Sequence, residues 1–151
     1  MRRSSDPIEP IRKSRVVGIA PSAAFELFTD GMGSWWPLDT HSISADVRSL
    51  IRFEGWIGGR VVEVTPAGDE HPWAEVLAWD PPWRFALSWH PSVEPVAASV
   101  LELRFVPEGD GTRVELEHCG WEEFGAEVDR RLREQYDPGW DAVLERYTGP
   151  L

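Results

Sequence analysis

The sequence predicts an α+β domain in which one long amphipathic helix lies across one curved antiparallel sheet. Near the carboxyl terminus, apolar side chains recur every three or four residues, which is the spacing of one helix face. Upstream, much of the chain alternates apolar and polar residues, the period of a strand with one wet face. The expected order is one strand, two short helices, six strands and the long helix. Strands that follow one another directly are typical of α+β proteins rather than alternating α/β proteins.

The predicted long helix runs from Glu122 to Tyr147 and would be roughly 40 Å long. A rod of that length can cross six or seven strands spaced about 4.8 Å apart. Asp137-Pro138-Gly139 interrupts it, because proline lacks a backbone donor and disfavours helical geometry in the residue before it. A kink or brief break near Tyr136–Pro138 and a boundary between two helices both remain open. The apolar face consists of Trp121, Phe124, Val128, Leu132, Tyr136, Trp140, Val143, Leu144 and Tyr147.

Prolines and glycines mark the ends of the other elements. A first strand is expected over Arg12–Ile19, followed by a short helix over Pro21–Phe28, a second helical turn that ends at Trp36, and a loop over Pro37–Ala45. The later strands are expected at Val47–Glu54, Arg60–Thr65, Trp73–Trp79, Trp83–Trp89, Ser99–Val106 and Thr112–His118. The alternation is cleanest in the last pair.

Composition limits the classes of partner. The chain has 151 residues, enough for one domain, which we place at residues 11–151 after a loose tail at residues 1–10. Its 26 acidic and 15 basic side chains give a formal charge of -11, which argues against nucleic acid and against an anionic membrane surface. No apolar run reaches the ~18 residues of a membrane span. Because Cys119 is the lone cysteine, a reducing cytoplasm is the expected compartment.

Five stretches of this chain, in the same order, resemble a known family. They are Ala20–Ser42, Gly58–Val64, Trp73–Pro91, Gly111–Trp121 and Gly139–Tyr147. The chain resembles the SRPBCC or START-like superfamily, and more closely the branch named after the activator of Hsp90 ATPase homologue 1. The resemblance implies the helix-grip fold, a seven-stranded antiparallel sheet wrapped around the carboxy-terminal helix with a cavity between them. Pro138 and the long segment before it depart from the family's pattern. The fold does not choose among its functions, which include lipid and hormone binding, polyketide cyclisation or aromatisation, and chaperone activation.

Nine tryptophans are the compositional outlier, and they predict either a tryptophan-rich core or an aromatic-lined cavity. A ligand pocket is expected to be mostly apolar with a few convergent polar groups. The candidate ligand-binding residues are Trp36, His41, Trp79, Trp89, His118, Trp121, Tyr136 and Trp140.

Two titratable residues are candidates for proton transfer. His118 continues the inward face of Val114 and Leu116, so it is either a general base in the cavity or a core histidine with its hydrogen bonds satisfied. Glu63 lies in a strand whose inward face the pattern does not decide. If Glu63 points outward it is a surface charge, and if inward it is a buried carboxylate with a raised pKa.

The sequence predicts no metal site and no cofactor. No pair among His41, His71, His90, His118 and Cys119 has the close spacing of a zinc site, and no phosphate-binding loop is present. The leading hypothesis is a protein that binds a small hydrophobic or aromatic molecule. The alternatives are a cyclase or aromatase that uses His118 or Glu63, and a protein that activates a chaperone. Self-association as a homodimer stays open.

Overall fold

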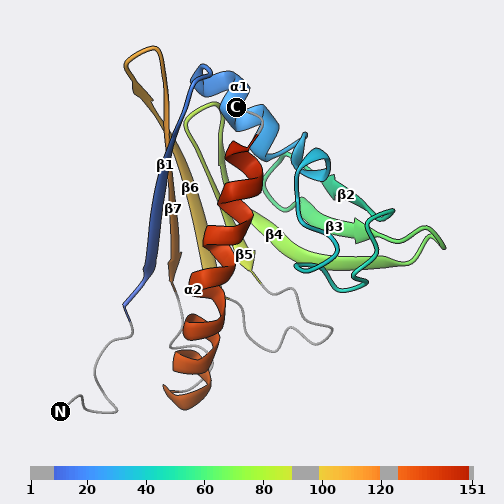
Figure 1. The fold of residues 1–151 in the computed structure, drawn as a ribbon. Helices are drawn as coiled ribbons and strands as arrows, with labels where there is room; N and C mark the ends of the chain where they lie inside the picture. The colour runs from blue at the N-terminus through green and yellow to red at the C-terminus, as the bar shows by residue number, and fades with distance from the viewer. Residues whose placement is uncertain (1–8, 90–98, 120–125, 150–151) are drawn as a thin grey trace.

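The computed structural model describes residues 9–89, 99–119 and 126–149, except the side chains of residues 126–133 and 135 (Figure 1). Its elements in chain order are β1 (Ile11–Val17), α1 (Pro21–Phe28), the short 3-10 helix η1 (Met32–Ser34), β2 (Leu50–Phe53), β3 (Arg60–Val64), β4 (Glu70–Asp80), β5 (Arg84–Trp89), β6 (Ser99–Glu108), β7 (Gly111–Cys119) and α2 (Ala126–Thr148). The predicted order of elements is confirmed.

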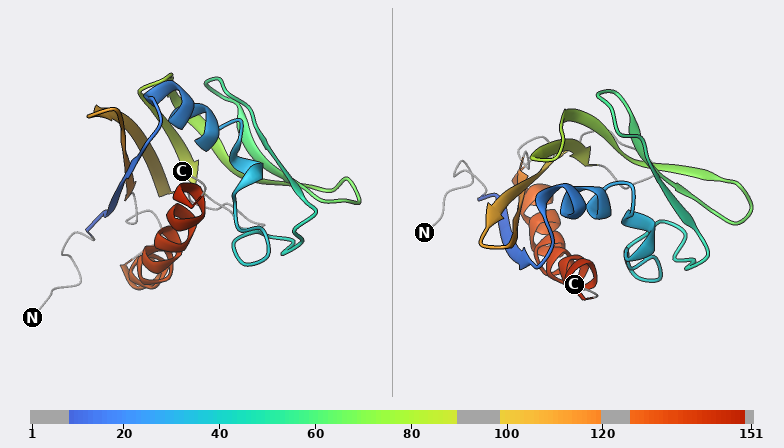
Figure 2. Two further views of the ribbon diagram at one scale, coloured as in Figure 1. Left: turned by 45° about the horizontal axis from the view of Figure 1, so that its top comes forward. Right: turned by 90° about the horizontal axis from the view of Figure 1, so that it is seen from above.

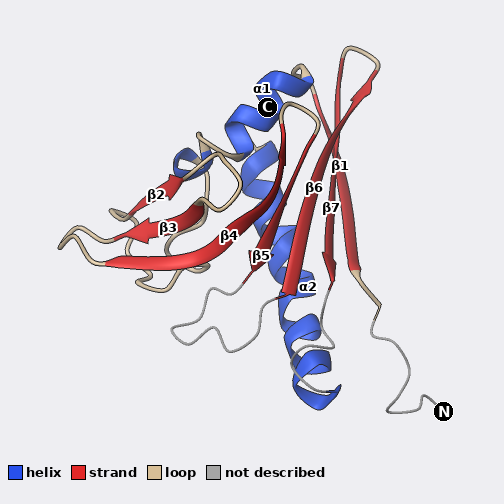
Figure 3. Ribbon diagram, turned by 180° about the vertical axis from the view of Figure 1, so that it is seen from behind, coloured by secondary structure: helices blue, strands red, loops and turns tan. Residues whose placement is uncertain are grey.

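The strands form one seven-stranded antiparallel sheet in the order β1-β7-β6-β5-β4-β3-β2. From β2 onward each strand pairs with the next in the sequence, and β1 closes the other edge by pairing with β7. The sheet curls around α2, and α1 lies beside the carboxyl-terminal end of that helix (Figure 2). The Tyr147 hydroxyl fixes this arrangement by donating to the Ala24 carbonyl at 2.8 Å. Figure 3 shows the sheet from behind, with the strands in front of α2.

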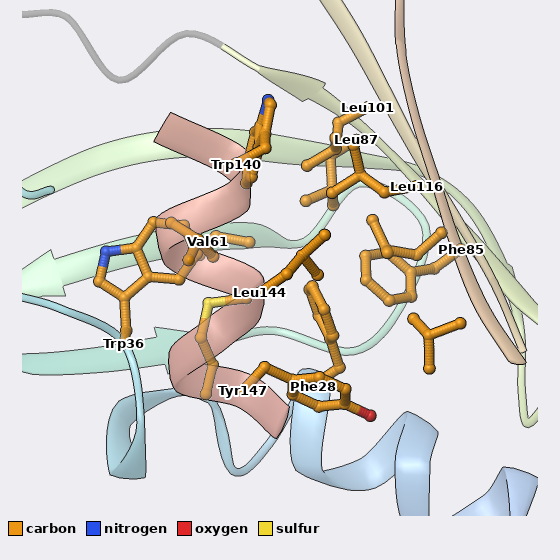
Figure 4. Close-up of a cluster of buried hydrophobic side chains, with 14 of the residues drawn as sticks. Phe28, Trp36, Val61, Phe85, Leu87, Leu101, Leu116, Trp140, Leu144 and Tyr147 are labelled. Carbon is orange, nitrogen blue, oxygen red and sulfur yellow. The ribbon is translucent and has the colours of Figure 1, made fainter. Parts of the chain in front are cut away.

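The core fills the space between the concave face of the sheet and α2 (Figure 4). The alternation of β6 and β7 sets its floor, because Leu101, Leu103 and Phe105 pair in register with His118, Leu116 and Val114, and all six are buried. On the outer face, Glu102 accepts from Arg84 at 2.7 Å and from Arg104 at 2.8 Å. The period of two thus separates core from solvent as expected.

Helix α2 is continuous from Ala126 to Thr148 with Pro138 inside it, so the expected boundary between two helices is wrong. Ion pairs hold the helix on both sides of the proline. Lys13 of β1 binds Asp137 and Asp141, and Arg15 contacts Asp141 at 3.1 Å. These contacts tie the helix to the edge strand where proline removes a backbone donor. On the next two turns, Trp140, Val143, Leu144 and Tyr147 are buried, as predicted.

The strand expected at Val47–Glu54 is shorter in the structure, where β2 covers Leu50–Phe53. Asp46 explains the difference, because its carboxylate accepts from the Arg48 backbone N–H at 2.9 Å and forms a turn. Val47 then points into solvent and is 68% exposed. The predicted strand was too long because the apolar Val47 was counted as its first residue, whereas Val47 belongs to this turn.

Candidate functional site

A cavity of about 350 Å³ lies between α2, the loop after η1, and strands β4 and β5. We call it the aromatic cavity. Its volume falls within the range of small-molecule sites, about 300–1,000 Å³. It is lined by Trp36, Thr40, His41, Ser42, Trp73, Trp89, Tyr136, Gly139, Trp140 and Val143.

A larger hollow of about 440 Å³ lies over β1, β6 and β7 and is lined mainly by charged residues. Several of those charged side chains already have ion-pair partners. Arg12 contacts Glu117 at 3.2 Å, and Arg104 contacts Glu102 at 2.8 Å. Exposed pairs of this kind are solvated surface features, so the aromatic cavity is the better candidate site.

Four indole rings form one contiguous wall of the aromatic cavity. The ring centroids of Trp36 and Trp73 are 5.1 Å apart, those of Trp36 and Trp89 are 6.1 Å apart, and those of Trp89 and Trp140 are 5.2 Å apart. The Tyr136 ring is nearly parallel to that of Trp140, at 20° and 6.4 Å. These separations match the distances at which aromatic rings interact favourably. The rings come from the loop, from β4, from β5 and from α2, so only the folded chain assembles them.

His118 is buried behind Trp140 and does not line the aromatic cavity. The Trp140 indole N–H donates to its Nδ1 at 2.9 Å, and its Nε2 lies 2.5 Å from the Ser99 hydroxyl. Because an indole N–H can only donate, Nδ1 must be unprotonated and Nε2 must carry the proton. Burial lowers the pKa of His118 to about 3. The imidazole is therefore neutral and positions Trp140. Of the two interpretations of His118, the structure agrees with a core histidine whose hydrogen bonds are satisfied.

Glu63 is fully buried, so the outward, surface-charge reading is wrong. Its carboxylate accepts from the backbone N–H groups of Ile43 and Ser44 at 2.8 and 2.9 Å, from the Ser44 hydroxyl, and from the Trp73 indole N–H at 3.1 Å. Burial raises the pKa of Glu63, but these hydrogen bonds outweigh burial and lower it below the usual value, contrary to the expected rise. A register shift at Val61/Val62 hid this inward orientation from the sequence pattern.

Glu63 does not line the aromatic cavity either. The ionised carboxylate of Glu63 links the loop at 43–44 to the indole of Trp73 through hydrogen bonds. The cyclase hypothesis needed His118 or Glu63 inside the cavity, and neither lies there. In that form, the hypothesis fails.

Trp89 carries a buried indole N–H that has no hydrogen-bond acceptor among the described residues. Burial raises the pKa of the neighbouring Tyr136 phenol to about 12, so the phenol is neutral, and the nearby Trp89 side chain has a smaller, opposite effect on that pKa. An unsatisfied buried donor costs about 1–3 kcal/mol, and the Trp89 nitrogen is closed off from the cavity as well as from bulk solvent.

His41 lines the aromatic cavity beside α2. Its Nδ1 lies 2.7 Å from the Thr40 hydroxyl, and its backbone carbonyl accepts from the Trp36 indole N–H at 2.7 Å. Its Nε2 lies 3.7 Å from where a Cβ on Gly139 would stand. A Cβ at residue 139 would therefore make ordinary van der Waals contact with the imidazole of His41.

The other predicted site residues lie elsewhere. Trp79 packs edge-on against Phe25, with ring centroids 5.0 Å apart, and it does not line the aromatic cavity. Trp121 and His90 lie outside the described residues. Sequence reasoning missed Trp73, although its place in an expected strand between other tryptophans was a usable signal. It also missed Thr40 and Ser42, for which the sequence held no comparable signal, and Val143, which it placed only on the buried face of the long helix.

Among the described helices, none combines the length and the hydropathy needed to cross a membrane. The described residues also contain no group of three or more His, Cys, Asp or Glu side chains placed to hold a metal ion.

The fold and its cavity define a helix-grip protein. Residues 19–148 match the family described as activator of Hsp90 ATPase homolog 1-like protein, and this chain belongs to that family. No match is found among the curated proteins.

Solved structures agree with this placement. The anthrahydroquino-gamma-pyrone synthase Txn09, complexed with SUM, is 31% identical over 96% of this chain and 98% of that chain, with a TM-score of 0.63. Protein MLL2253 from Mesorhizobium loti is 19% identical over 93% of this chain and 95% of that chain, with a TM-score of 0.66. The Aha1 dimer from Colwellia psychrerythraea is 14% identical over 93% of this chain and 94% of that chain, also with a TM-score of 0.66. The last two similarities support the fold alone.

Proposed function

We propose that this chain binds a flat, neutral aromatic molecule in the aromatic cavity. The observation that carries the proposal is a space of about 350 Å³ walled by four indole rings and one phenol ring. Flat rings that stack or meet edge-on would replace water on these surfaces and gain both apolar burial and ring contacts.

The polar groups of the cavity favour a neutral ligand with an oxygen acceptor. Among the lining residues that the structure describes, none is Lys, Arg, Asp or Glu, so a charged ligand would lose its hydration without gaining a partner. The Tyr136 phenol lines the cavity and stays protonated, so its O–H is a donor of the kind that suits a carbonyl or phenol oxygen. The similar protein Txn09 is named a synthase of an anthrahydroquino-pyrone, which supports an aromatic ligand class here.

The test is a binding screen that reads thermal stability and indole fluorescence together. Neutral fused-ring aromatics that carry a carbonyl group are compared with fatty acids and with uncharged sterols. A ligand at 100 times its dissociation constant should add about 2.7 kcal/mol to the free energy of unfolding. It should also change the emission of the indole wall. If every aromatic leaves both signals unchanged, the proposal is wrong, and a response to lipids alone would reassign the ligand class.

A second candidate function is activation of an Hsp90-type chaperone, which the family's name suggests. Trp56 and Ile57 are 59% and 69% exposed, and Leu77 is also exposed. Backbone hydrogen bonds of 2.9 and 2.8 Å join the turn after Ile57 to Val76. They bring these apolar side chains into one region, which suits a protein contact.

The chaperone function is tested by measuring the ATPase rate of the chaperone with this chain and with its Trp56→Ser variant. The function would be supported if the parent chain stimulates the ATPase rate and the Trp56→Ser variant does not. An unchanged rate at saturating chain concentration would remove it. Light scattering on the same samples tells whether the surface instead joins two copies of the chain.

A further inference from the structure

One wall of the aromatic cavity is a loop, whereas strands and a helix form the others. Trp73 and Trp89 lie on β4 and β5, and each of these strands is paired on both sides within the sheet. Trp140 lies on α2, which ion pairs join to β1. The remaining wall includes residues 40–42, which belong to the loop between η1 and β2. This loop is therefore the wall with the least secondary structure to hold it.

The loop is packed at both ends and accessible between them. Trp36 and Leu38 are buried before residues 39–48, and Ser49 is buried after them. Every residue from 39 to 48 is half-buried or exposed. A segment with few buried contacts between two fixed ends can open without unfolding the rest of the domain.

One side chain from the sheet holds the middle of this loop. The Glu63 carboxylate accepts from the backbone N–H groups of Ile43 and Ser44 at 2.8 and 2.9 Å, and from the Ser44 hydroxyl. Among the described residues, the other hydrogen bonds of residues 39–48 stay within the loop and the residues that flank it. Breaking the bonds to Glu63 would therefore release the loop from β3.

The closed loop makes only a weak contact with α2. His41 Nε2 lies 3.7 Å from where a Cβ on Gly139 would stand, and the described residues show no hydrogen bond between residues 39–48 and the helix. Ala45 has a φ of 55°, a backbone region that residues other than glycine avoid. The closed loop thus carries local strain that opening can release.

We propose that residues 39–48 form a lid over the aromatic cavity, that the ligand enters and leaves when the lid opens, and that Glu63 holds the lid closed. This inference rests on the proposed binding function and adds the route by which the ligand enters. Because Glu63 does not line the cavity, a bound ligand leaves its hydrogen bonds to the loop unchanged. Weakening these bonds therefore speeds entry and release by the same factor and leaves the affinity as it is.

The first experiment measures the binding kinetics of prodan, a neutral naphthalene ketone whose fluorescence responds to apolar surroundings. Stopped-flow mixing gives the rate of entry, and dilution of the complex gives the rate of release. Glu63→Gln turns an acceptor oxygen into a donor that faces the N–H groups of the loop. We expect both rates to rise at least about fivefold, as for the loss of one hydrogen bond to a charged group, while the dissociation constant changes less than about twofold.

A second variant and a matched control make the result specific. Ser44→Ala removes the hydroxyl donor and keeps both backbone N–H groups, so both rates should rise by a smaller factor. Glu75→Gln is the control, because Glu75 is an exposed carboxylate of β4 that does not line the cavity. Its rates should equal those of the parent chain. Circular dichroism checks that each variant is folded, and Ser44→Ala decides the question if Glu63→Gln does not fold.

The second experiment needs no ligand. Hydrogen exchange measured by NMR reports the opening of the Ile43 and Ser44 N–H groups that Glu63 binds. Low concentrations of urea should leave their exchange rate unchanged, because opening the lid exposes little surface. The N–H of Leu103, in the centre of the sheet, should instead exchange faster as urea promotes global unfolding. Glu63→Gln should accelerate exchange at Ile43 and Ser44 by about the same factor as ligand entry.

The outcomes separate the lid from the proposed function. If prodan binds but Glu63→Gln leaves both rates unchanged, or raises the release rate alone, the lid is wrong and the binding function stands. The lid is also wrong if Ile43 and Ser44 exchange only through global unfolding. If prodan does not bind, an aromatic that binds in the screen described above takes its place. If no neutral aromatic binds, both the lid and the binding function are wrong.

Discussion

The indole N–H of Trp140 donates a 2.9 Å hydrogen bond to Nδ1 of His118, and this bond joins α2 to β7 inside the core. It fixes the tautomer of the imidazole and the orientation of the indole together, because neither group has another orientation that preserves the bond. Since Trp140 is also part of the wall of the aromatic cavity, the bond links helix docking to the shape of the site.

Truncating Trp140 should therefore destabilise the fold. Trp140→Ala should lower the free energy of unfolding by about 3–5 kcal/mol, the usual cost of deleting a buried large aromatic side chain. Trp140→Phe keeps a ring but leaves Nδ1 of His118 unsatisfied, which adds about 1–3 kcal/mol to the cost of the smaller ring. Urea denaturation measures both. Trp83→Phe is the matched control, because Trp83 is 53% exposed and its loss should stay within about 0.5 kcal/mol. A change below about 1 kcal/mol for Trp140→Ala would mean that Trp140 only borders an open space.

His118 should make stability fall as the pH drops below neutrality. Burial lowers its pKa to about 3 in the folded chain, against 6.5 as the ordinary value. Above pH 6.5 the group is neutral in both states, so its contribution is complete there. Between pH 6.5 and about 3 the unfolded chain takes up a proton that the folded chain does not. Stability is lost at up to about 1.4 kcal/mol per pH unit across this window.

The matched variant for this pH effect is His118→Asn, which does not titrate. Chemical denaturation of both chains between pH 7 and 5 gives the difference in slope. The variant should be less stable at pH 7 but should lack the His118 part of the slope. Identical slopes would contradict the buried, neutral imidazole.

Glu63→Gln should loosen the loop that carries His41. The neutral amide replaces one acceptor oxygen by a donor that faces the N–H groups of the loop, so we expect a loss of about 1–3 kcal/mol at pH 7. The lowered pKa of Glu63 means that its contribution is present above its ordinary value of 4.5 and is lost as the pH falls through the folded-state pKa. The stability gap between the parent chain and the variant should thus narrow below pH 4.5. A stability difference that widens below pH 4.5 would contradict the role of ionised Glu63 in holding the loop.

Trp89→Phe should have opposite effects on stability and on binding. Removing a buried N–H that has no acceptor among the described residues should raise the free energy of unfolding by up to about 1–3 kcal/mol. The smaller ring offsets part of this gain, so the net free energy of unfolding should be unchanged or higher. Affinity for an aromatic ligand should fall, because the smaller ring removes about 0.5–1.5 kcal/mol of ring contact from the wall of the aromatic cavity. Thermal melts with and without ligand measure both quantities. An unaltered affinity would show that the Trp89 ring does not contact the ligand.

Gly139→Ala should stabilise α2. Glycine inside a helix costs about 0.5–1 kcal/mol relative to alanine. The new Cβ would meet His41 Nε2 at 3.7 Å, which is ordinary van der Waals contact. We expect a gain of about 0.5–1 kcal/mol in urea denaturation. Gly139→Leu is the contrasting variant, since its longer side chain would displace His41 and fill part of the aromatic cavity. A loss of stability in Gly139→Ala would show that the loop and helix are closer than described.

Much of the fold was predictable because local patterns carry it. The alternation along β6 and β7 predicted their buried faces, and the three- and four-residue spacing from Trp140 to Tyr147 predicted the face of α2 that meets the sheet. Local patterns failed where a distant contact decided the outcome. At Pro138 the pattern left open a kink or a boundary, and Lys13 and Arg15 from β1 hold one helix across it. At Glu63 it left open a surface charge or a buried carboxylate, and the loop at 43–44 closes over the side chain.

The sequence by itself determined the class of fold, since periodicity and turn residues report on each element's own face and length. It also supplied the aromatic residues from which a cavity could be built. Only the tertiary structure decided which of them share that cavity and which titratable group faces it. His41, Trp89 and Tyr136 come from a loop, a strand and a helix far apart in the chain. Their meeting depends on how the sheet curls around α2, and no local pattern records that curvature.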